Sequence, residues 1–373
     1  MSGAKEVSRK RIFVTGLRGI PGIMGGVETH CEELLPRIAR LAPELSLHVL
    51  GRAPYMAESE TSVGDVSVTA LPSPRRQSLE AIVSTMIGIW HARRHRADLV
   101  HIHAVGPALT VPFARLLGLR TVVTHHGADY DRAKWGRFAK TMLRLGERAG
   151  MSARQIIAVS PSLKDMLEKR YPKASPRLSY IPNGAPALAE DARARKEVLR
   201  SVGVEAGKFV LTVGRLVPEK AFDDLVAAHA ISGDTRALLI VGAADHASPF
   251  ASRLLKKASE RVIFAGLQPR SVLAHLYASC DLFVLPSRHE GLPIVALEAA
   301  KAGANMLLSD IPANLDVGLD ADNYYPVGER DALAAALSQP GHAYPVDADA
   351  ISRRFDWDRI ATETAAVYRR ALG

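Results

Sequence analysis

Cysteines and long apolar runs are scarce in this sequence. Only two cysteines, Cys31 and Cys280, occur among its 373 residues, and their separation suits neither a disulfide framework nor a zinc site, which fits a reducing compartment. No apolar run approaches the roughly 20 residues that a membrane-spanning helix needs, and a short strand follows the charged N-terminal residues where a signal peptide would have its apolar core. These absences predict a cytoplasmic protein and leave peripheral binding to the inner face of the plasma membrane open.

Two familiar nucleotide-binding motifs are also missing. No Gly-Lys-Ser/Thr sequence of a P-loop occurs, and the glycine-rich stretch 16–30 lacks the G-x-G-x-x-G spacing. The next predicted strand ends in Gly51-Arg52, with no acidic residue for a ribose. The stretch does hold five glycines between a predicted strand and a predicted helix. Gly25 and Gly26 lead into a helix start suited to phosphate, and a purely structural loop is the alternative.

Positive charge is concentrated in one half of the chain. Residues 1–180 contain 27 Lys and Arg against 15 Asp and Glu, a balance of +12, whereas the remainder has a balance of −3. The first half therefore suits an anionic partner, which can be nucleic acid, anionic lipid or a phosphate-bearing substrate. We predict no nucleic-acid partner, because no recognised binding module occurs and the basic residues are not interleaved with stacking aromatics.

Eleven apolar segments alternate with helical stretches along the chain. Their Val, Ile and Leu content predicts parallel strands buried on both faces. Six strands precede and five follow a polar, Ala-rich stretch at 183–208, so the predicted class is α/β with two doubly wound, Rossmann-like domains, residues 1–182 and 183–356. The segments are 11–16, 45–51, 98–104, 120–127, 155–160, 178–184, 209–215, 237–243, 261–266, 281–287 and 304–310.

Polar residues follow several of these strands, where ligands bind in such sheets. Two domains that present their strand ends to each other would form one cleft. Arg215 and Lys220 follow the first strand of the second domain, and a planar guanidinium with a point charge suits a diphosphate. Two surface charges on a loop are the alternative.

The stretch SRHEGLPIVALEAAKAG places Glu290 just before a predicted helix and Glu298 inside it. Pro293 predicts the helix start, whose unpaired N–H groups attract anions. The alternative is that Glu290 caps the helix and Glu298 lies on a solvated face.

Four histidines lie at the ends of the third and fourth predicted strands: His101, His103, His125 and His126. Clustered histidines suggest zinc, but no H-E-x-x-H or matching cysteine set accompanies them, so we predict no metal site. A neutral His126 that hydrogen-bonds a polar ligand is favoured, and a satisfied core histidine is the alternative for His101 and His103.

Residues 131–150 predict an amphipathic helix with an apolar stripe beside a basic one. Such a helix suits an anionic membrane surface, and a helix with one face in the core and the other solvated is the alternative. The apolar stripe is Trp135, Phe138, Met142, Leu145 and Ala149, and the basic stripe is Lys134, Arg137, Lys140, Arg144 and Arg148.

Together, the Glu290-x7-Glu298 spacing, GRLVPEK, IPNG and the Gly-Gly loop resemble the retaining glycosyltransferases of family 4, which have the GT-B fold. The resemblance covers essentially the whole chain, and FDWDRIATETAAVYRRAL implies a helix at about 357–373 that packs back on the first domain. GGVET and HHGADYDRAKWG resemble a bacterial branch used in surface polysaccharide assembly, although Tyr130 stands where that branch has Trp.

The resemblance implies a role for each matching residue. Arg215 and Lys220 would hold the donor's diphosphate, Glu298 the ribose hydroxyls and Glu290 the transferred sugar, with His126 at the reacting carbon. His126, Glu290, Arg215 and Lys220 would be the catalytic residues. The other donor-binding residues would be Gly25, Gly26, Asn183, Leu267, Gly291, Leu292 and Pro293, with Glu28 and Asp129 on the acceptor side. No metal or other cofactor is implied.

The function predicted from this resemblance is retaining, metal-independent transfer of a sugar from a nucleotide-diphosphate sugar to a lipid-linked or polysaccharide acceptor, in cell-surface polysaccharide biosynthesis. The donor base stays open between UDP, GDP and dTDP. Two alternatives also stay open: a nucleotide-sugar epimerase or hydrolase of the same fold, and a non-catalytic scaffold that binds polyanions.

Overall fold

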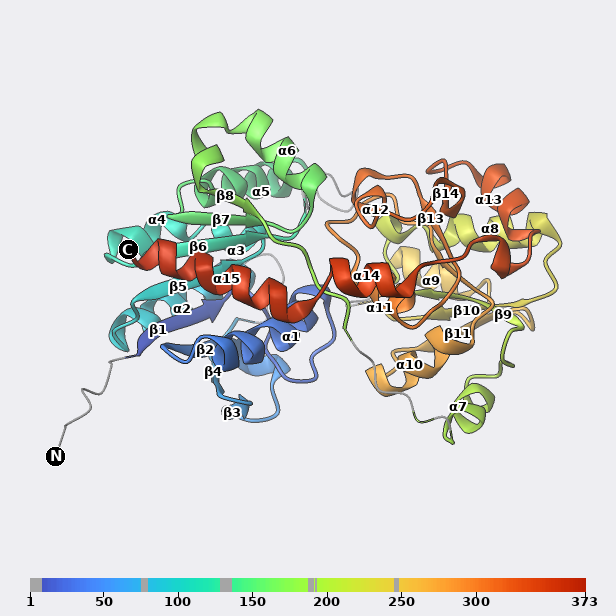
Figure 1. The fold of residues 1–373 in the computed structure, drawn as a ribbon, viewed down its shortest axis with the longest axis horizontal. Helices are drawn as coiled ribbons and strands as arrows, with labels where there is room; N and C mark the ends of the chain where they lie inside the picture. Colours follow the sequence, from blue (N-terminus) through green and yellow to red (C-terminus); the bar gives the residue numbers. More distant parts are fainter. Residues whose placement is uncertain (1–8, 75–79, 128–135, 187–190, 192, 245–247) are drawn as a thin grey trace. The chain divides into compact units, whose positions relative to one another are not determined.

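The computed structural model describes residues 9–74, 80–127, 136–186, 191, 193–244 and 248–373 (Figure 1). They form two compact units. The first contains the described residues up to Gly184 together with Asp356–Gly373, and the second contains Ala185–Phe355. Among the described residues, no helix is long and apolar enough to cross a membrane.

The first unit is built on an eight-stranded sheet with the strand order β3-β4-β2-β1-β5-β6-β7-β8. All neighbouring strands are parallel except β3 and β4. The strands are β1 (Lys10–Thr15), β2 (Leu45–Arg52), β3 (Glu60–Val63), β4 (Val66–Leu71), β5 (Leu99–His103), β6 (Arg120–His125), β7 (Gln155–Ala158) and β8 (Leu178–Tyr180). The helices are α1 (Gly26–Leu41), α2 (Glu80–Arg94), α3 (Val105–Ala108), α4 (Val111–Leu116), α5 (Arg137–Gly150), α6 (Pro161–Arg170) and α15 (Trp357–Leu372).

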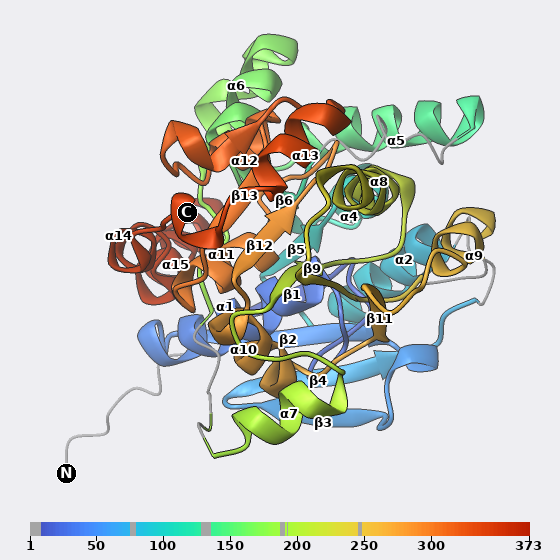
Figure 2. The same ribbon diagram turned by 90° about the vertical axis from the view of Figure 1, so that its right-hand side faces the viewer.

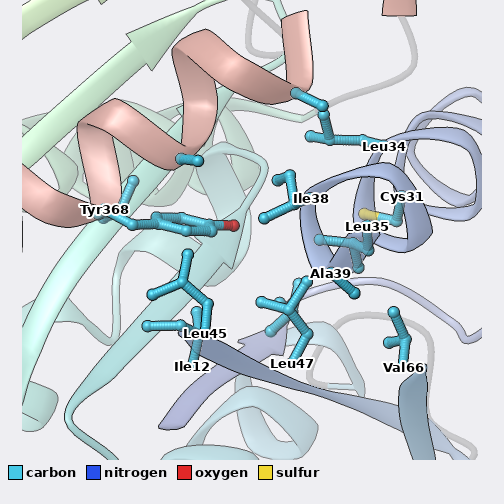
Figure 3. Packing of buried hydrophobic residues seen from close by; sticks show 14 of the residues in the cluster. Ile12, Cys31, Leu34, Leu35, Ile38, Ala39, Leu45, Leu47, Val66 and Tyr368 are labelled. Carbon is cyan, nitrogen blue, oxygen red and sulfur yellow. The ribbon is translucent and has the colours of Figure 1, made fainter. Parts of the chain in front are cut away.

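The C-terminal helix α15 packs on α1 over one face of this sheet. Figure 3 shows Tyr368 of α15 beside Ile38 of α1 and Ile12 and Leu45 of the sheet. Tyr368 is fully buried, and its hydroxyl lies 2.8 Å from Nδ1 of His101. Each large apolar side chain buried here contributes about 1.5–3 kcal/mol, so α15 is part of the core of the first unit.

The second unit has a six-stranded, fully parallel sheet with the order β11-β10-β9-β12-β13-β14. Helices cover both of its faces, with α8 and α13 on one face and α10 and α11 on the other (Figure 2). The strands are β9 (Phe209–Val213), β10 (Ala237–Val241), β11 (Val262–Gly266), β12 (Leu282–Leu285), β13 (Met306–Ser309) and β14 (Tyr324–Tyr325). The helices are α7 (Arg195–Ser201), α8 (Phe222–Ser232), α9 (Pro249–Leu255), α10 (Arg270–Ser279), α11 (Ile294–Lys301), α12 (Pro312–Leu315), α13 (Arg330–Leu337) and α14 (Ala348–Arg354).

These two sheets confirm the predicted pair of doubly wound α/β domains, and all eleven predicted strands are present. The prediction missed β3, β4 and β14. Residues of β3 alternate between exposed and half-buried, so they form no continuous apolar run, and β14 is only two residues long. The cleft between the domains stays a prediction.

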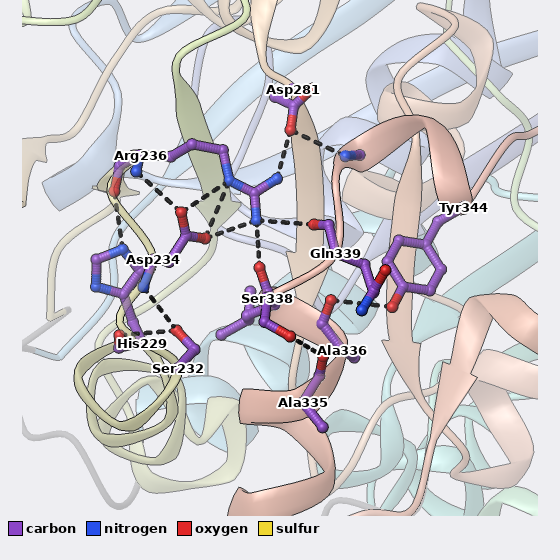
Figure 4. Close-up of polar contacts among 12 residues, drawn as sticks. His229, Ser232, Asp234, Arg236, Asp281, Ala335, Ala336, Ser338, Gln339 and Tyr344 are labelled. Atoms are coloured by element: carbon purple, nitrogen blue, oxygen red, sulfur yellow. Dashed lines mark hydrogen bonds and ion pairs between the residues drawn. The ribbon is translucent and has the colours of Figure 1, made fainter.

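Arg236 forms a hydrogen-bond network at the amino ends of strands in the second sheet (Figure 4). Its guanidinium donates to both carboxylate oxygens of Asp234 and to Asp281, which immediately precedes β12. It also donates to the carbonyl oxygens of Leu337 (2.5 Å) and Gln339 (3.2 Å), at the end of α13. This network ties β10, β12 and α13 together at the edge opposite the loops described next.

Candidate active site

The strand order of the second sheet reverses between β9 and β12. From β9 the chain continues to β10 and β11 on one side, and from β12 it continues to β13 and β14 on the other. β9 and β12 pair directly, with Phe283 opposite Leu211. In open α/β sheets, such a switch point leaves a crevice where ligands bind. Arg215 and Lys220 lie in the loop after β9, and Glu290 lies in the loop after β12.

Two glycines allow the loops after β9 and β10 to approach each other. A Cβ atom on Gly242 would lie 1.8 Å from the carbonyl oxygen of Gly214, and φ of Gly242 is +143°, so only glycine fits there. The loop after β9 ends in the short 3₁₀ helix Pro218–Lys220 and then in Ala221, whose φ of 51° is rare for a residue with a side chain. Arg215 and Lys220 are both half-buried in this tightly constrained loop.

Lys220 and Glu290 contact each other directly. The ammonium of Lys220 lies 2.5 Å from Oε1 of Glu290, and the hydroxyl of Ser287 donates to the same oxygen at 2.7 Å. The two charged side chains are 13% and 12% exposed, so their attraction is screened less than at the surface. Glu290 thus holds a cation at the switch point. The structure brings these two side chains into contact, and their predicted roles in donor binding and catalysis stay predictions. The alternative that Glu290 caps the helix is not supported, because Pro293 is the N-cap.

Glu298 is a buried carboxylate on α11, with 5% of its surface exposed. Its Oε2 accepts a hydrogen bond from the hydroxyl of Tyr277 at 3.1 Å, and its Oε1 lies 3.8 Å from the guanidinium of Arg270. Burial, followed by the charge of Glu298, raises the pKa of Tyr277, so its hydroxyl stays protonated and donates. The alternative that placed Glu298 on a solvated face is therefore wrong.

The start of α11 lies one residue later than the sequence predicts. Pro293 is the N-cap, with φ −74° and ψ 106°, and the helix begins at Ile294. Pro293 and the side chain of Leu292 are buried, while Gly291 is half-buried. The first N–H groups of the helix need partners from outside the helix, which keeps this turn suited to an anion. Leu267, just after β11, is 56% exposed and therefore open to a ligand.

In the first unit, Arg18 and Glu28 shape the glycine-rich loop that follows β1. Oε1 of Glu28 accepts from the backbone N–H of Arg18 (3.0 Å) and from its Nε (3.2 Å). A Cβ atom on Gly25 would lie 2.1 Å from Oε2 of Glu28, so glycine is needed for this ion pair. Gly26 begins α1 and has open space around its Cα. Glu28 is buried, and its contact with Arg18 holds the glycine-rich loop in place. Its role on the acceptor side stays a prediction.

Two of the predicted histidines are structural. His101 is fully buried, and its two ring nitrogens lie 2.8 Å and 2.7 Å from the hydroxyls of Tyr368 and Thr124. Nε2 of His125 lies 3.2 Å from the buried carboxylate of Glu147, and its Nδ1 accepts from the N–H of Gly127. These bonds satisfy both rings, as expected for core histidines.

His126 instead joins His103 and a third histidine that the sequence analysis did not single out, His30 of α1. Nδ1 of His103 lies 3.0 Å from Nε2 of His126, and the ring of His30 lies edge-on to that of His126 at 5.0 Å. Each of the three can offer a ring nitrogen, and these nitrogens lie within 4.8 Å of one another. Burial lowers the pKa of His30 to about 4 and the pKa of the other two well below 6.5. The cluster is therefore neutral at pH 7.

Asn183 orients His30. Its Oδ1 lies 2.9 Å from Nδ1 of His30, and its side chain is buried. The following glycine, Gly184, packs against Trp357, because a Cβ atom there would lie 2.3 Å from the indole ring. Asn183 and Gly184 of the IPNG motif thus make contacts within the first unit. The donor contact predicted for Asn183 stays a prediction.

The sequence analysis missed several polar partners. Glu147 is almost fully buried and accepts from Arg170 and Tyr171 as well as His125. Tyr277 and Ser287 bond the two carboxylates of the second unit. Glu147 and Tyr277 carry no local motif, since their partners lie about 20 residues or more along the chain, whereas Ser287 lies three residues before Glu290. Asp129, predicted on the acceptor side, lies outside the described residues.

Helix α5 differs from an ordinary core helix in what it buries. Its buried residues are Gly146, Glu147 and Gly150, while Phe138 and Leu145 of the predicted apolar stripe are 81% and 47% exposed. Leu145 lines a shallow surface depression with neighbouring side chains of α4 and α5. That depression is lined by Leu109, Pro112, Arg115, Leu116, Leu145, Arg148, Ala149 and Ser152. Trp135 and Lys134 of the predicted stripes lie outside the described residues.

Two protein families match this chain. Residues 24–187 match the family described as Glycosyltransferase Family 4, and residues 195–340 match the family described as Glycosyl transferases group 1. The chain is 25% identical to the alpha-maltose-1-phosphate synthase of Mycolicibacterium smegmatis, over 94% of this chain and 96% of that protein. It is 27% identical to the GDP-mannose-dependent alpha-mannosyltransferase of Mycobacterium tuberculosis, over 95% and 99% of the two chains.

Solved structures share the fold at lower identity. The sucrose-phosphate synthase of Thermosynechococcus elongatus superposes with a TM-score of 0.77 at 20% identity, over 97% of this chain and 98% of that one. Anabaena HepE in complex with UDP and glucose superposes with a TM-score of 0.74 at 18% identity, over 97% and 99%. At these identities the likeness is one of fold.

Proposed function

This chain belongs to the group 1 glycosyltransferases of GT-B fold, and we propose that it is a retaining enzyme that moves a sugar from a nucleotide-diphosphate sugar to a lipid-linked or polysaccharide acceptor. The observation that carries the proposal is the contact of Lys220 with Glu290 at the switch point of the second sheet. A cation held in the loop that leads into a helix start suits a diphosphate.

The proposed reaction breaks the bond between the anomeric carbon and the diphosphate oxygen. Negative charge develops on the leaving phosphate while the sugar gains oxocarbenium character. Lys220 and Arg215 stabilise the developing negative charge from fixed positions, so they need no reorganisation as the bond breaks. These two cations and the start of α11 supply the charge stabilisation, and the proposed chemistry needs no metal.

Retention follows if the acceptor oxygen attacks the anomeric carbon from the face that the phosphate leaves. The new bond forms to the acceptor oxygen, and the proton of the acceptor hydroxyl passes to the leaving phosphate oxygen. Glu290 keeps Lys220 in place and positions the sugar, and it forms no covalent bond. In the first unit, the neutral ring of His126 offers a hydrogen bond to a sugar hydroxyl without adding positive charge near the oxocarbenium-like carbon.

The buried carboxylate of Glu298 suits the donor's ribose. Two oxygens of one carboxylate can accept from two neighbouring hydroxyls, and Tyr277 fixes one of these oxygens in orientation. The base is not decided by these contacts. One relative named above is GDP-mannose-dependent, and one structural neighbour is bound to UDP, so UDP, GDP and dTDP stay candidates.

The exposed apolar side chains of α4 and α5 support a membrane-bound acceptor. Leu116 and Phe138 are 83% and 81% exposed, and Arg115 and Arg148 line the same depression as Leu116 and Leu145. Apolar side chains flanked by arginines suit the headgroup region of anionic lipids. A lipid-linked acceptor for cell-surface polysaccharide would lie at such a surface.

Product analysis tests the reaction. Donor and acceptor together should give a glycoside whose anomeric configuration, read by NMR, matches that of the donor sugar. Donor alone should stay intact over the same time. Rapid formation of an epimer, or stoichiometric free sugar, would favour an epimerase or hydrolase. A glycosyl adduct trapped on Glu290 would contradict front-face attack.

Flotation with vesicles tests the membrane surface separately. The wild-type chain should float with vesicles that contain anionic lipid and remain behind with zwitterionic ones. Replacing both Leu116 and Phe138 by Ser should abolish flotation. Replacing Leu255, an exposed residue at the end of α9 in the second unit, should leave it unchanged. Equal flotation of all three proteins would remove the case for this surface.

A further inference from the structure

We propose that the first unit contains a site for a borderline divalent cation such as Zn²⁺, formed by the ring nitrogens of His30, His103 and His126. Ligand nitrogens in a tetrahedral zinc site with bonds of about 2.0–2.1 Å are roughly 3.3 Å apart. Nδ1 of His103 and Nε2 of His126 are already 3.0 Å apart, and each of the three histidines has one ring nitrogen within 4.8 Å of a ring nitrogen of the other two. Side-chain movements well below 2 Å would therefore complete the triangle.

His30 is already oriented as a ligand. Its Nδ1 faces the amide oxygen of Asn183, which can only accept, so Nδ1 carries the proton and Nε2 carries the lone pair. Nε2 is buried and has no hydrogen-bond partner among the described residues. An unsatisfied buried acceptor is costly, and a metal ion at this position would satisfy it. Metal-binding histidines characteristically donate their other N–H to an oxygen in this way.

The remaining two histidines can supply lone pairs without any net release of protons. One proton is shared between Nδ1 of His103 and Nε2 of His126, and it moves to the second nitrogen of the same ring when the metal binds. The sulfur of Cys31 lies 3.7 Å from Nε2 and 3.8 Å from Nδ1 of His103, so it can accept from Nε2 once the proton has moved there and the metal has taken Nδ1.

The three ligands leave a fourth position on the metal. His30 and His103 are buried, whereas His126 is half-buried, so the site opens on the side of His126. No carboxylate belongs to the group, and the bound ion would therefore keep its two positive charges and take water or an anion as the fourth ligand. Since the proposed function puts His126 at the reacting carbon, a metal bound there would exclude the sugar. The ion is then an inhibitor and not a cofactor.

Binding is measured first, without any substrate. Titration of the metal-free wild-type chain with ZnCl₂, followed by calorimetry, should give one site per chain. His30→Gln should abolish that site, and Asn183→Ala should weaken it by about 10–100-fold, the usual cost of removing a residue that orients a ligand. Unfolding midpoints measured without metal check that both variants are folded. Unchanged affinity in folded His30→Gln would overturn the proposal.

A matched control separates this site from surface histidines. His95 stacks on His91 at 4.1 Å near the end of α2, and a pair of histidines four residues apart can bind zinc weakly. His95→Gln should leave the single site intact. If His95→Gln removes it and His30→Gln does not, the binding belongs to the surface pair and the proposal fails.

X-ray absorption identifies the ligands, and a transfer assay tests the consequence. Zinc bound to the wild type should show nitrogen or oxygen neighbours at about 2.0–2.1 Å and no sulfur at about 2.3 Å. A sulfur neighbour would show that Cys31 is a ligand and would contradict a site formed by the three histidines alone. Zinc should inhibit transfer, with recovery on adding EDTA. Binding without inhibition would contradict the overlap with the sugar, while no binding at all would leave the proposed transfer reaction untouched.

Discussion

The two units use the same architecture and present opposite chemistry at their switch points. In the second unit, the loops beyond β9 and β12 hold a half-buried ion pair, Lys220 with Glu290. In the first unit, the strand order reverses between β1 and β5. Burial lowers the pKa values of His103, at the end of β5, and of His126, just after β6. In the proposed reaction, the charged pair lies near the leaving phosphate and the neutral rings lie near the cationic sugar. The difference teaches that the residues after the strands, and not the parallel sheet itself, set the electrostatic environment of each unit.

The largest expected effect is in the second unit. Lys220→Ala should lower the transfer rate by about 10²–10³-fold, because a fixed positive charge at the leaving group is lost. Lys208→Ala is the matched control, since Lys208 is exposed and pairs with Glu205 in its surface loop. Rates are measured with saturating donor and acceptor. Equal rates for Lys220→Ala and the wild type would contradict a catalytic role of the ion pair in the second unit.

In the first unit, we expect a substitution to lower the free energy of unfolding and not the transfer rate. Glu147→Gln removes the buried carboxylate that His125, Arg170 and Tyr171 share. Because Arg170 is 42% exposed and stays hydrated after the change, we expect a loss of about 1–3 kcal/mol. Urea unfolding should show this loss. Glu168→Gln, which breaks a partly exposed pair with Lys164, should leave the unfolding curve unchanged. A stable Glu147→Gln protein with impaired transfer would assign this residue to the reaction.

A smaller effect is expected at Glu298. Tyr277→Phe removes one hydrogen bond to its carboxylate, so affinity for the nucleoside diphosphate should fall about fivefold, equivalent to ~1 kcal/mol. Tyr344→Phe is the control, because the hydroxyl of Tyr344 donates to the carbonyl of Ala336 near α13 (Figure 4). Calorimetric titration measures both. Equal affinities in the two variants would show that Glu298 does not depend on Tyr277.

The smallest effect is expected at the cysteines, where the two units should behave alike. Burial raises the pKa of the Cys280 thiol to about 12 and raises the pKa of the Cys31 thiol as well. At pH 8 only about 10⁻⁴ of Cys280 is thiolate, so it should react with a thiol reagent only after denaturation. The rate should increase tenfold for each unit of pH below that pKa. Fast labelling of the native chain at pH 8 would contradict the raised pKa values of the two thiols.

The sequence predicted the second site better than the first, for a physical reason. Charged side chains are seldom buried without a partner, so Lys220, Glu290 and Glu298 near strand ends already indicate a site. Histidine is both a common core residue and a common ligand, and only tertiary contacts separate His101, which Tyr368 satisfies, from His126. His30 could have been suspected from its position one turn into the helix after the glycine-rich loop. Its partner Asn183 lies 153 positions away, which no local pattern connects.

The fold followed from apolar runs, and its errors lie where those runs are absent. The eleven buried strands were identifiable because both faces of a parallel strand are covered. The hairpin of β3 and β4 faces solvent along part of its length, and its alternation is too short to stand out. The start of α11 differed by one residue because Pro293 adopts an extended backbone as the N-cap.

Thermal unfolding against UDP, GDP, dTDP and ADP tests most directly whether Lys220 and Glu290 hold a nucleoside diphosphate. A bound nucleotide at 100 times its Kd should stabilise the chain by about 2.7 kcal/mol. We predict that at least one of the four raises the unfolding midpoint of the wild type and that Lys220→Ala loses most of this shift. Midpoints that no nucleotide changes, or a shift that survives intact in Lys220→Ala, would contradict the account.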